Sequence, residues 1–138
     1  MSQPGETWSQ PVVGFQTDQF PAFYLRETDP PLGVDARFDD LRELASYVRA
    51  ELLRTGRGIV VANPIPMQDQ VAPADWRRWL DAATAQAAIS GRAGRDVTPL
   101  VLGKLHEVSG GATLRANIAL IKANAALAGK LARAMSRA

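Results

Sequence analysis

Short apolar runs and apolar residues at helical spacing divide this chain into expected strands and helices. Residues 11–15 and 22–25 are apolar runs bounded by polar residues and breakers, which is typical of short strands. Residues 58–62 form a continuous run rich in β-branched side chains, which is typical of a strand buried on both faces. The Asn-Pro-Ile-Pro stretch at 63–66 ends this third strand, because proline cannot donate to a sheet ladder.

Helix signals of two kinds, caps and apolar spacing, first appear after residue 38. Asp39 and Asp40 are expected at the start of a helix, where their charge suits the dipole, and Gly56 and Gly58 are expected at its end. Pro73 fits the first turn of a second helix, whose expected apolar stripe continues toward residue 83.

Two more helices are predicted in the last third of the chain. Thr98 followed by Pro99 predicts an N-cap and a first helical residue, and Thr113 is the expected cap of the final helix. The face of that final helix expected to be apolar comprises Leu114, Ile118, Ile121, Ala125, Ala128 and Leu131. The predicted order is therefore β-β-α-β-α-α-α, an α/β fold with few strands and a helix-rich C-terminal half.

The predicted sheet is small for strands that look buried. Parallel strands are normally covered on both faces, and this chain offers little to cover them. Part of the fold is therefore expected to be missing or supplied by another chain. Residues 1–10 are expected to be a flexible N-terminus, and 11–138 are expected to form one unit.

Composition excludes several classes of chemistry. The 138 residues contain no cysteine, so disulfides, cysteine-ligated zinc and a cysteine nucleophile are excluded. No signal peptide and no stretch of about 20 apolar residues is present, so a cytoplasmic protein without a membrane partner is expected. The net charge is only +2 and the basic residues are dispersed along the sequence, which disfavours nucleic-acid binding.

Several polar residues are candidates for a site, each with a simpler structural interpretation. Asn63 follows a buried strand, where α/β proteins bind ligands, but it also suits a rigid turn. Asn117 and Asn124 share a helix face and need hydrogen-bond partners, which a ligand can supply but which a neighbouring backbone supplies more often. Thr17 and Asp18 suit either a polar ligand or the cap of a turn, and the turn is favoured.

His106 is the only histidine and is expected to be exposed, beside rather than on the apolar stripe of its helix. Because no second histidine and no paired carboxylates accompany it, a metal site there is not expected. Spacing rules alone leave the chain as an α/β domain without an assigned role.

Four stretches together resemble one family. Residues 11–26 (PVVGFQTDQFPAFYLR) resemble its PVVGYGTDEFPAFYTR, and residues 60–66 resemble its VLVANPIP. Residues 97–100 resemble its VTPF, and residues 110–125 resemble its GGxSLxANIALVKNNA. Four motifs in the same order, across almost the whole chain, are specific. The family is that of the pseudouridine-5′-phosphate glycosidases, also called indigoidine synthase A-like proteins.

The resemblance implies an α/β/α sandwich, a homotrimer and a divalent metal, usually Mn²⁺. It also implies reversible cleavage of the C–C bond between uracil and ribose 5-phosphate in pseudouridine 5′-phosphate, through a Schiff base on a lysine. The family's lysine, its proton-moving glutamate and its metal-binding aspartate belong to its N-terminal part. This chain matches the C-terminal part only, and none of its lysines, Lys104, Lys122 and Lys130, lies in a matching segment.

Asn117 matches the family's active-site asparagine, and Asn63, Thr17 and Asp18 match motif positions near that site. Three departures stand inside the matched region: Gln16 replaces a glycine, Gln19 replaces a glutamate, and Gly103 lies within a helix. A turn that used a positive φ at the glycine is expected to change.

Two interpretations stay open and a third ranks far below them. In the first, the chain is the C-terminal part of a glycosidase that is inactive without a lysine-bearing N-terminal half on a separate chain. In the second, it is a non-catalytic remnant or interaction module. The third sets the resemblance aside and treats the chain as a helical binding module.

Overall fold

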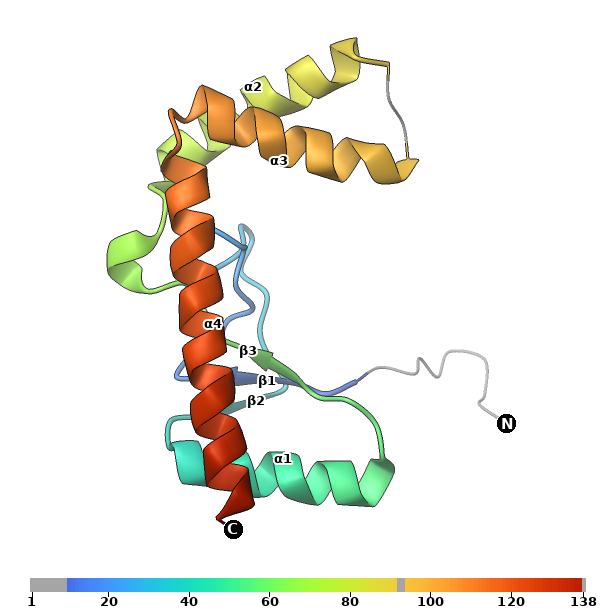
Figure 1. The fold of residues 1–138 in the computed structure, drawn as a ribbon, viewed down its shortest axis with the longest axis vertical. Coiled ribbons are helices and arrows are strands. Elements are labelled where there is room, and N and C mark those ends of the chain that lie inside the picture. The colour runs from blue at the N-terminus through green and yellow to red at the C-terminus, as the bar shows by residue number, and fades with distance from the viewer. Residues whose placement is uncertain (1–9, 92–93, 138) are drawn as a thin grey trace.

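The protein is described by a computed structural model that covers residues 10–91 and 94–137. The expected flexible segment 1–10 therefore lies outside the described residues, except for Gln10. The elements, drawn in Figure 1, are β1 (Val12–Phe15), β2 (Ala36–Phe38), α1 (Leu41–Thr55), β3 (Val60–Ala62), the 3₁₀ turn η1 (Met67–Asp69), α2 (Pro73–Ile89), η2 (Gly94–Asp96), α3 (Val97–Val108) and α4 (Ala112–Ser136).

The sheet has three parallel strands in the order β2-β1-β3. The predicted strand at 22–25 is wrong: Ala22 and Leu25 form an isolated antiparallel bridge across a tight turn. The second strand is β2 instead, which the pattern missed because three residues that include Arg37 give no apolar run. The observed order of strands and helices agrees with the prediction, but the second strand is β2 and not the segment at 22–25.

Helical cover lies on one face of this sheet. Val13 of β1 is fully buried against Leu44 and Val48 of α1, with Phe15 packed beside them. Alternate strand residues point to opposite faces, so Val60 of β3 points away from α1, and it is 40% exposed. Ala62 points to the same face as Val60 and is buried, so the expectation that the third strand is buried on both faces holds at Ala62 and fails at Val60.

The first helix has the ends that its sequence predicts. The Asp40 carboxylate accepts hydrogen bonds from the backbone N–H groups of Arg42 and Glu43, at 2.7 and 3.2 Å. At the other end Gly56 adopts a left-handed conformation with φ 65°, and its N–H donates to the Leu52 carbonyl. Asp40 is the N-cap and Gly56 the C-cap, so α1 is confirmed.

Helices α2 and α3 pack side by side (Figure 1). Pro73 occupies the first turn of α2, as predicted, and Ala83 and Ala87 are its buried residues. Helix α3 begins at Val97 directly after η2, so Thr98 lies inside the helix and the prediction that it is the N-cap is wrong.

The last helix begins without the cap that the sequence suggests. Its N-cap is Gly111, with φ 87° and no side-chain hydrogen bond. Thr113 is fully buried, and its N–H donates to Ser109 Oγ at 3.2 Å while its hydroxyl bonds His106. The prediction of a Thr113 cap is wrong because that hydroxyl is engaged between α3 and α4.

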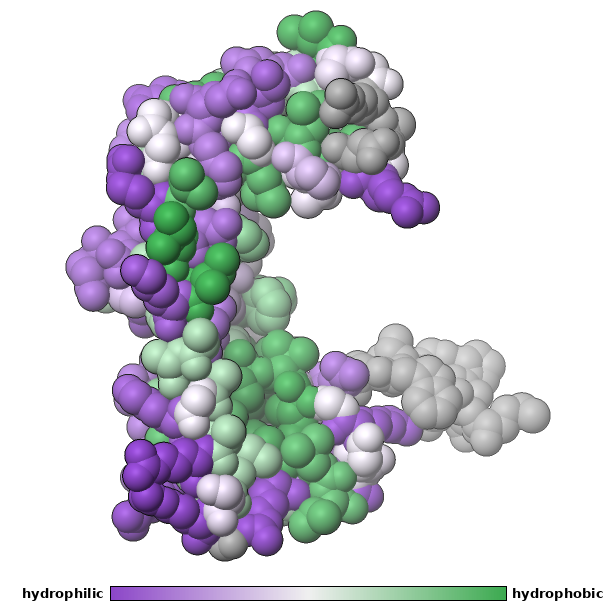
Figure 2. Space-filling view, viewed as in Figure 1, coloured by the Kyte–Doolittle hydropathy of each residue, from purple (hydrophilic) through white to green (hydrophobic). Residues whose placement is uncertain are grey.

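The apolar face predicted for α4 is largely on the outside. Leu114, Ile118 and Ile121 are 45, 46 and 60% exposed, and an apolar stripe follows this half of the helix in Figure 2. The buried side is formed by Thr113 and Ala116. Because α4 is apolar on two sides, periodicity alone does not say which side packs inward.

Two groups of buried residues make up the core. The sheet cluster comprises Val13, Leu44 and Val48, with partly buried neighbours that include Leu131 and Met135 of α4. The loop cluster comprises Tyr24, Ile65, Val71 and Ala116. Helix α4 contributes to both clusters and so joins the lower and upper parts of the molecule (Figure 1).

Candidate functional site

The carboxyl ends of the strands gather the motif residues. Strands β1 and β3 are parallel neighbours, so the segments that follow them, which contain Thr17 and Asn63, leave the same edge of the sheet. Asn63 Nδ2 donates to Asn124 Oδ1 at 3.1 Å, across 61 residues of sequence. The structure therefore joins the end of β3 to α4 at the edge where α/β proteins bind ligands.

Thr17 is used by the turn that follows β1. It is 8% exposed, and its Oγ1 accepts a hydrogen bond from the Gln19 N–H at 3.0 Å and donates to the Gln19 carbonyl at 3.2 Å. A Cβ on Gly14 would lie 2.2 Å from the Thr17 carbonyl oxygen, so only glycine fits beneath this turn. These bonds support the turn interpretation of Thr17.

Gln16 keeps the conformation that a glycine adopts most easily. Its φ is 58°, its N–H donates to the Phe38 carbonyl at 2.8 Å, and its side chain donates to the Asp39 carbonyl at 3.3 Å. The expectation that the turn changes is therefore wrong. Glutamine bears a cost of about 1–2 kcal/mol for the left-handed backbone, and its added hydrogen bond offsets part of it.

Asp18 lies on the surface of the same turn in an ion pair. Its carboxylate oxygen Oδ2 lies 2.9 Å from Arg37 Nη1. Arg37 Nε in turn lies 2.9 Å from Asp39 Oδ1. The hydrogen bond that Arg37 donates to Asp39, followed by its hydrogen bond to Asp18 and the charge of that carboxylate, raises the pKa of the Arg37 guanidinium above its ordinary value. Asp18 is thus engaged with β2.

A manganese site does not fit these residues. Within the part of the chain that the structure describes, no three histidine, aspartate or glutamate side chains come together. Asp18 supplies a carboxylate at the strand ends, but Arg37 already neutralises it.

Asn117 has the features of a ligand contact. It is half-buried on α4, seven residues before Asn124, so both asparagines lie on one side of the helix. Asn124 is bonded to Asn63, whereas the amide of Asn117 has no hydrogen-bond partner among the described residues. The structure leaves the donors and the acceptor of Asn117 free, and it does not place Asn117 in contact with Asn63, Thr17 or Asp18.

The three lysines stand away from this edge. Lys104 of α3 pairs with Glu107 at 3.4 Å. Lys122 is exposed two residues before Asn124, which places it on the opposite side of α4. Lys130 lies further along α4, beside α1.

His106 differs from its expected exposure. It is half-buried, and its Nδ1 lies 2.7 Å from the Thr113 hydroxyl, which also lies 3.3 Å from Ser109 Oγ. This small polar network ties the end of α3 to the first turn of α4. No sequence pattern predicts this network, because its residues come from two separate predicted helices and the turn between them.

The turn at 22–26 also has a structural role that the sequence did not reveal. Arg26 Nη1 donates to the Ile65 carbonyl at 2.7 Å, and the Val71 N–H donates to the Tyr24 carbonyl at 3.0 Å. Tyr24 is fully buried, its hydroxyl has no hydrogen-bond partner among the described residues, and burial raises its pKa. The motif thus anchors the chain that leads from β3 to α2.

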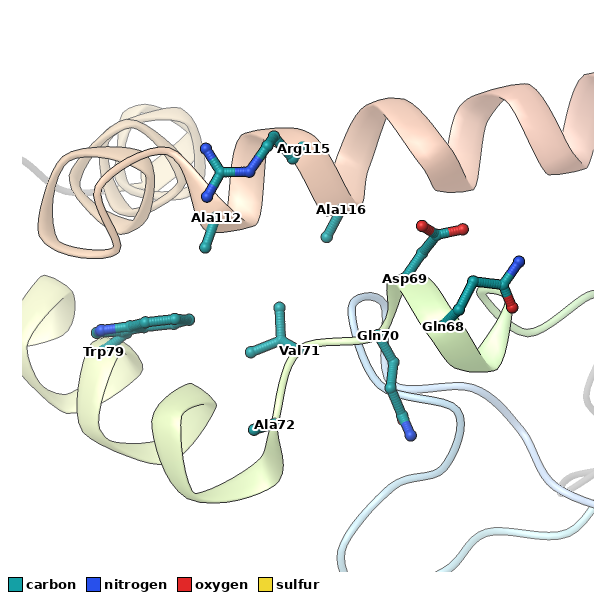
Figure 3. Close-up of a pocket in the computed structure, with 9 residues that line it drawn as sticks. All are labelled: Gln68, Asp69, Gln70, Val71, Ala72, Trp79, Ala112, Arg115 and Ala116. Atoms are coloured by element: carbon teal, nitrogen blue, oxygen red, sulfur yellow. The ribbon is translucent and has the colours of Figure 1, made fainter.

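A pocket of about 360 Å³ lies between the start of α4 and the segment that enters α2 (Figure 3). Val71, Trp79 and Ala116 give it an apolar wall, while Asp69 and Arg115 project from η1 and α4. The pocket adjoins the loop cluster, and sequence reasoning did not single out either charged residue. Asn117 is the next residue after Ala116, but it does not line this pocket.

These features define a small α/β chain with a polar site at the carboxyl ends of a parallel sheet. The family described as indigoidine synthase A like protein matches residues 4–134, and the chain belongs to this family. The sequence is 44% identical over 131 residues to a pseudouridine-5′-phosphate glycosidase of Methylobacterium nodulans, covering 94% of this chain and 38% of that protein. A Kosmotoga olearia protein of the same name is 43% identical, and the match covers 96% of this chain and 45% of that protein.

Solved structures agree with this assignment. The prealnumycin C-glycosynthase AlnA, solved in complex with ribulose 5-phosphate, has a TM-score of 0.78 at 33% identity, over 93% of this chain and 42% of its own. An indigoidine synthase A-like protein of Thermotoga maritima has a TM-score of 0.72 at 30% identity, and the match covers 89% of this chain and 40% of that protein. The chain thus spans about 40% of the length of these relatives and corresponds to their C-terminal part.

No helix among the described residues is both long enough and apolar enough to cross a membrane.

Proposed function

We propose that this chain supplies the C-terminal part of a pseudouridine-5′-phosphate glycosidase site, with Asn117 as its substrate contact. The observation that carries this proposal is the free amide of Asn117, half-buried on the helix face whose other asparagine bonds the end of β3. An amide that no protein group engages has both its donors and its acceptor available, and a sugar phosphate with its hydroxyl groups offers partners for both.

The amine for the covalent step comes from polypeptide outside these residues. The family resemblance assigns the Schiff base to a lysine of the N-terminal part, and the lysines present here stand on other faces of α3 and α4. The same polypeptide supplies the Mn²⁺ ligands. Among the residues that the structure describes, β2 and β3 have no partner on their outer edges and Val60 is exposed, which offers a surface on which that part of the fold packs. A homotrimer is the assembly that the resemblance implies.

The test is complementation. This chain is mixed with a separately expressed N-terminal segment of the Methylobacterium nodulans relative, cut where the match to this chain begins. Release of uracil from pseudouridine 5′-phosphate is then measured. We expect no release by either polypeptide alone and measurable release by the mixture, because only the mixture holds both the lysine and Asn117.

Asn117→Ala is expected to lower that restored rate on the order of a hundredfold, the usual cost of one polar contact to a reacting substrate. Gln86→Ala, which removes an exposed amide from α2, is the matched control and should leave the rate unchanged. An unaffected rate in the Asn117 variant would remove this residue from the site.

Borohydride trapping tests the missing amine directly. With ribose 5-phosphate present, we expect no adduct on this chain when it is incubated alone. An adduct on Lys104, Lys122 or Lys130 would overturn the proposal. A mixture that forms a stable complex without any turnover would instead support the alternative, a non-catalytic member that retains only the binding surface.

A further inference from the structure

Basic residues that are dispersed in the sequence gather in one place in the fold. A cavity of about 670 Å³ lies between the first turns of α1 and the last turns of α4. Four of its seven lining residues are cationic: Arg42 of α1, and Lys130, Arg133 and Arg137 at the end of α4. The cavity shares no residue with the asparagine site, so its role is separate from the proposed function.

These four cations have no acidic partner among the described residues, since none takes part in an ion pair there. No aspartate or glutamate follows Glu107 in the sequence, so α4 brings only positive charge to the cavity. The acids nearest in sequence to Arg42 are Asp39, Asp40 and Glu43, and none of them lines the cavity.

The nearby carboxylates are also largely engaged elsewhere. Asp39 pairs with Arg37, and Asp40 accepts the backbone N–H groups at the start of α1. Further along α1, Glu51 pairs with Arg54. Glu43 is exposed, and its carboxylate accepts no hydrogen bond among the described residues.

A helix dipole explains only part of this arrangement. Cations at the end of α4 are favourable there, because the C-terminal end of a helix carries partial negative charge. Arg42 is different: it lies in the first turn of α1, where the partial charge is positive and a cation is unfavourable. The Asp40 carboxylate already accepts the N–H groups of that turn, so the Arg42 side chain, and not the helix end, is the group left to bind an anion. A bound anion gives Arg42 and the cations at the end of α4 a shared partner.

We propose that this cavity binds a small organic phosphate with two or more negative charges. Three of its four cations are arginines, whose planar guanidinium group matches two phosphate oxygens at a time. Ser46 adds a hydroxyl donor. The volume suits a small ligand rather than a polymer, since ligand pockets span about 300–1,000 Å³.

Titration calorimetry with inorganic pyrophosphate on the full chain tests this proposal. We expect binding by the unaltered protein, and at least a tenfold loss of affinity in the double variant Arg42→Gln/Arg133→Gln. The matched control is Arg77→Gln. Arg77 is an exposed arginine of α2 that pairs with Asp29, and its removal should leave the affinity for pyrophosphate unchanged. Asn117→Ala should also bind as the unaltered protein does, which separates this cavity from the asparagine site.

Nuclear magnetic resonance of the unaltered chain gives a second readout that needs no variant. Pyrophosphate should shift the amide signals of residues 41–46 and 130–137. Ribose 5-phosphate should shift the same signals, and ribose should shift none.

Three results would overturn the proposal: no binding of pyrophosphate, unchanged affinity in the double variant, or amide shifts confined to other segments. Equal binding of citrate would replace phosphate recognition with general attraction of anions. Binding of single-stranded RNA without binding of pyrophosphate would assign the same patch to a nucleic acid instead.

Discussion

The sheet cluster and the loop cluster have similar burial but are built in different ways. Val13, Leu44 and Val48 come from a strand and a capped helix, so their burial follows from regular spacing. Tyr24 and Ile65 come from irregular segments that hydrogen bonds such as Arg26 to the Ile65 carbonyl hold in place. Equal burial therefore does not mean an equal contribution to stability, because the loop cluster also contains the Tyr24 hydroxyl, which is buried without a hydrogen-bond partner among the described residues.

The largest effect is expected in the sheet cluster. Leu44 is fully buried, so Leu44→Ala removes packed side-chain atoms and leaves a cavity. We expect it to lower the free energy of unfolding by about 3 kcal/mol, measured by urea denaturation. Leu53→Ala, on the same helix but 81% exposed, is the control and should change it by less than about 0.5 kcal/mol. Equal effects of the two variants would show that α1 does not pack on the sheet as described.

Gly14→Ala tests the contact between β1 and the turn above it. The added methyl group would lie 2.2 Å from the Thr17 carbonyl and 2.9 Å from its Cγ2, so the turn must move. We expect a loss of about 2 kcal/mol in the free energy of unfolding. Glycosidase activity restored by complementation should fall with it, because the turn leaves the edge that holds Asn63. Unchanged stability would mean that Thr17 does not cover Gly14.

Tyr24→Phe is expected to act in the opposite direction, and so distinguishes the two clusters. The Tyr24 hydroxyl is buried without a hydrogen-bond partner, which costs about 1–3 kcal/mol in similar cases. Its removal should therefore raise the free energy of unfolding by about 1 kcal/mol. Tyr47→Phe, at the edge of the sheet cluster, is the control and should have little effect. A loss of stability in the Tyr24 variant would reveal a partner for the hydroxyl.

Alkaline pH gives a second test of the same residue. Burial raises the pKa of Tyr24 in the folded protein, whereas the unfolded chain loses this proton near pH 10. The unfolded state therefore binds fewer protons above that pH, and stability is lost as pH rises through about 10 and beyond. We expect the difference in unfolding free energy between about pH 8 and pH 10.5 to be smaller in Tyr24→Phe. Identical pH dependence would show that Tyr24 ionises normally.

The same comparison separates what the sequence predicts from what it does not. Helix α1 was predicted with both of its ends, because Asp40 and Gly56 act on backbone groups within a few residues of themselves. The strand expected at 22–25 failed because Tyr24 is buried by Ile65, Val71 and Ala116, which lie far away in the sequence, and no local pattern records those contacts. The prediction of which face of α4 points inward was wrong for a similar reason. The helix has two apolar faces, and only contacts with distant segments decide which of them is buried.

The candidate site divides along the same line. Family motifs pointed to Asn63 and Asn117, but the bond between Asn63 and Asn124 spans 61 residues and appears only in the fold. The basic cavity was missed entirely, because Arg42 and Arg133 are separated by most of the chain. Gln16 shows the converse: its hydrogen bonds to the carbonyls of Phe38 in β2 and of Asp39 hold a left-handed turn that the sequence rule expected to change.

The smallest effect is expected at Gly103, inside α3. A Cβ built there meets no atom within 4 Å, so alanine fits without strain. Glycine within a helix costs up to about 1 kcal/mol relative to alanine, because its backbone loses more freedom on folding. Gly103→Ala should therefore raise the free energy of unfolding by slightly less than that amount, measured by urea denaturation.

Gly111→Ala is the matched change at a glycine that the fold needs. Its φ of 87° is unfavourable for any residue with a side chain, and the new Cβ would lie 3.2 Å from the Arg115 guanidinium. This variant should lose stability where Gly103→Ala gains it, although both add one methyl group near α4. If both variants gain stability, the turn between α3 and α4 is not left-handed, and the His106–Thr113 contact that it positions must be abandoned as well.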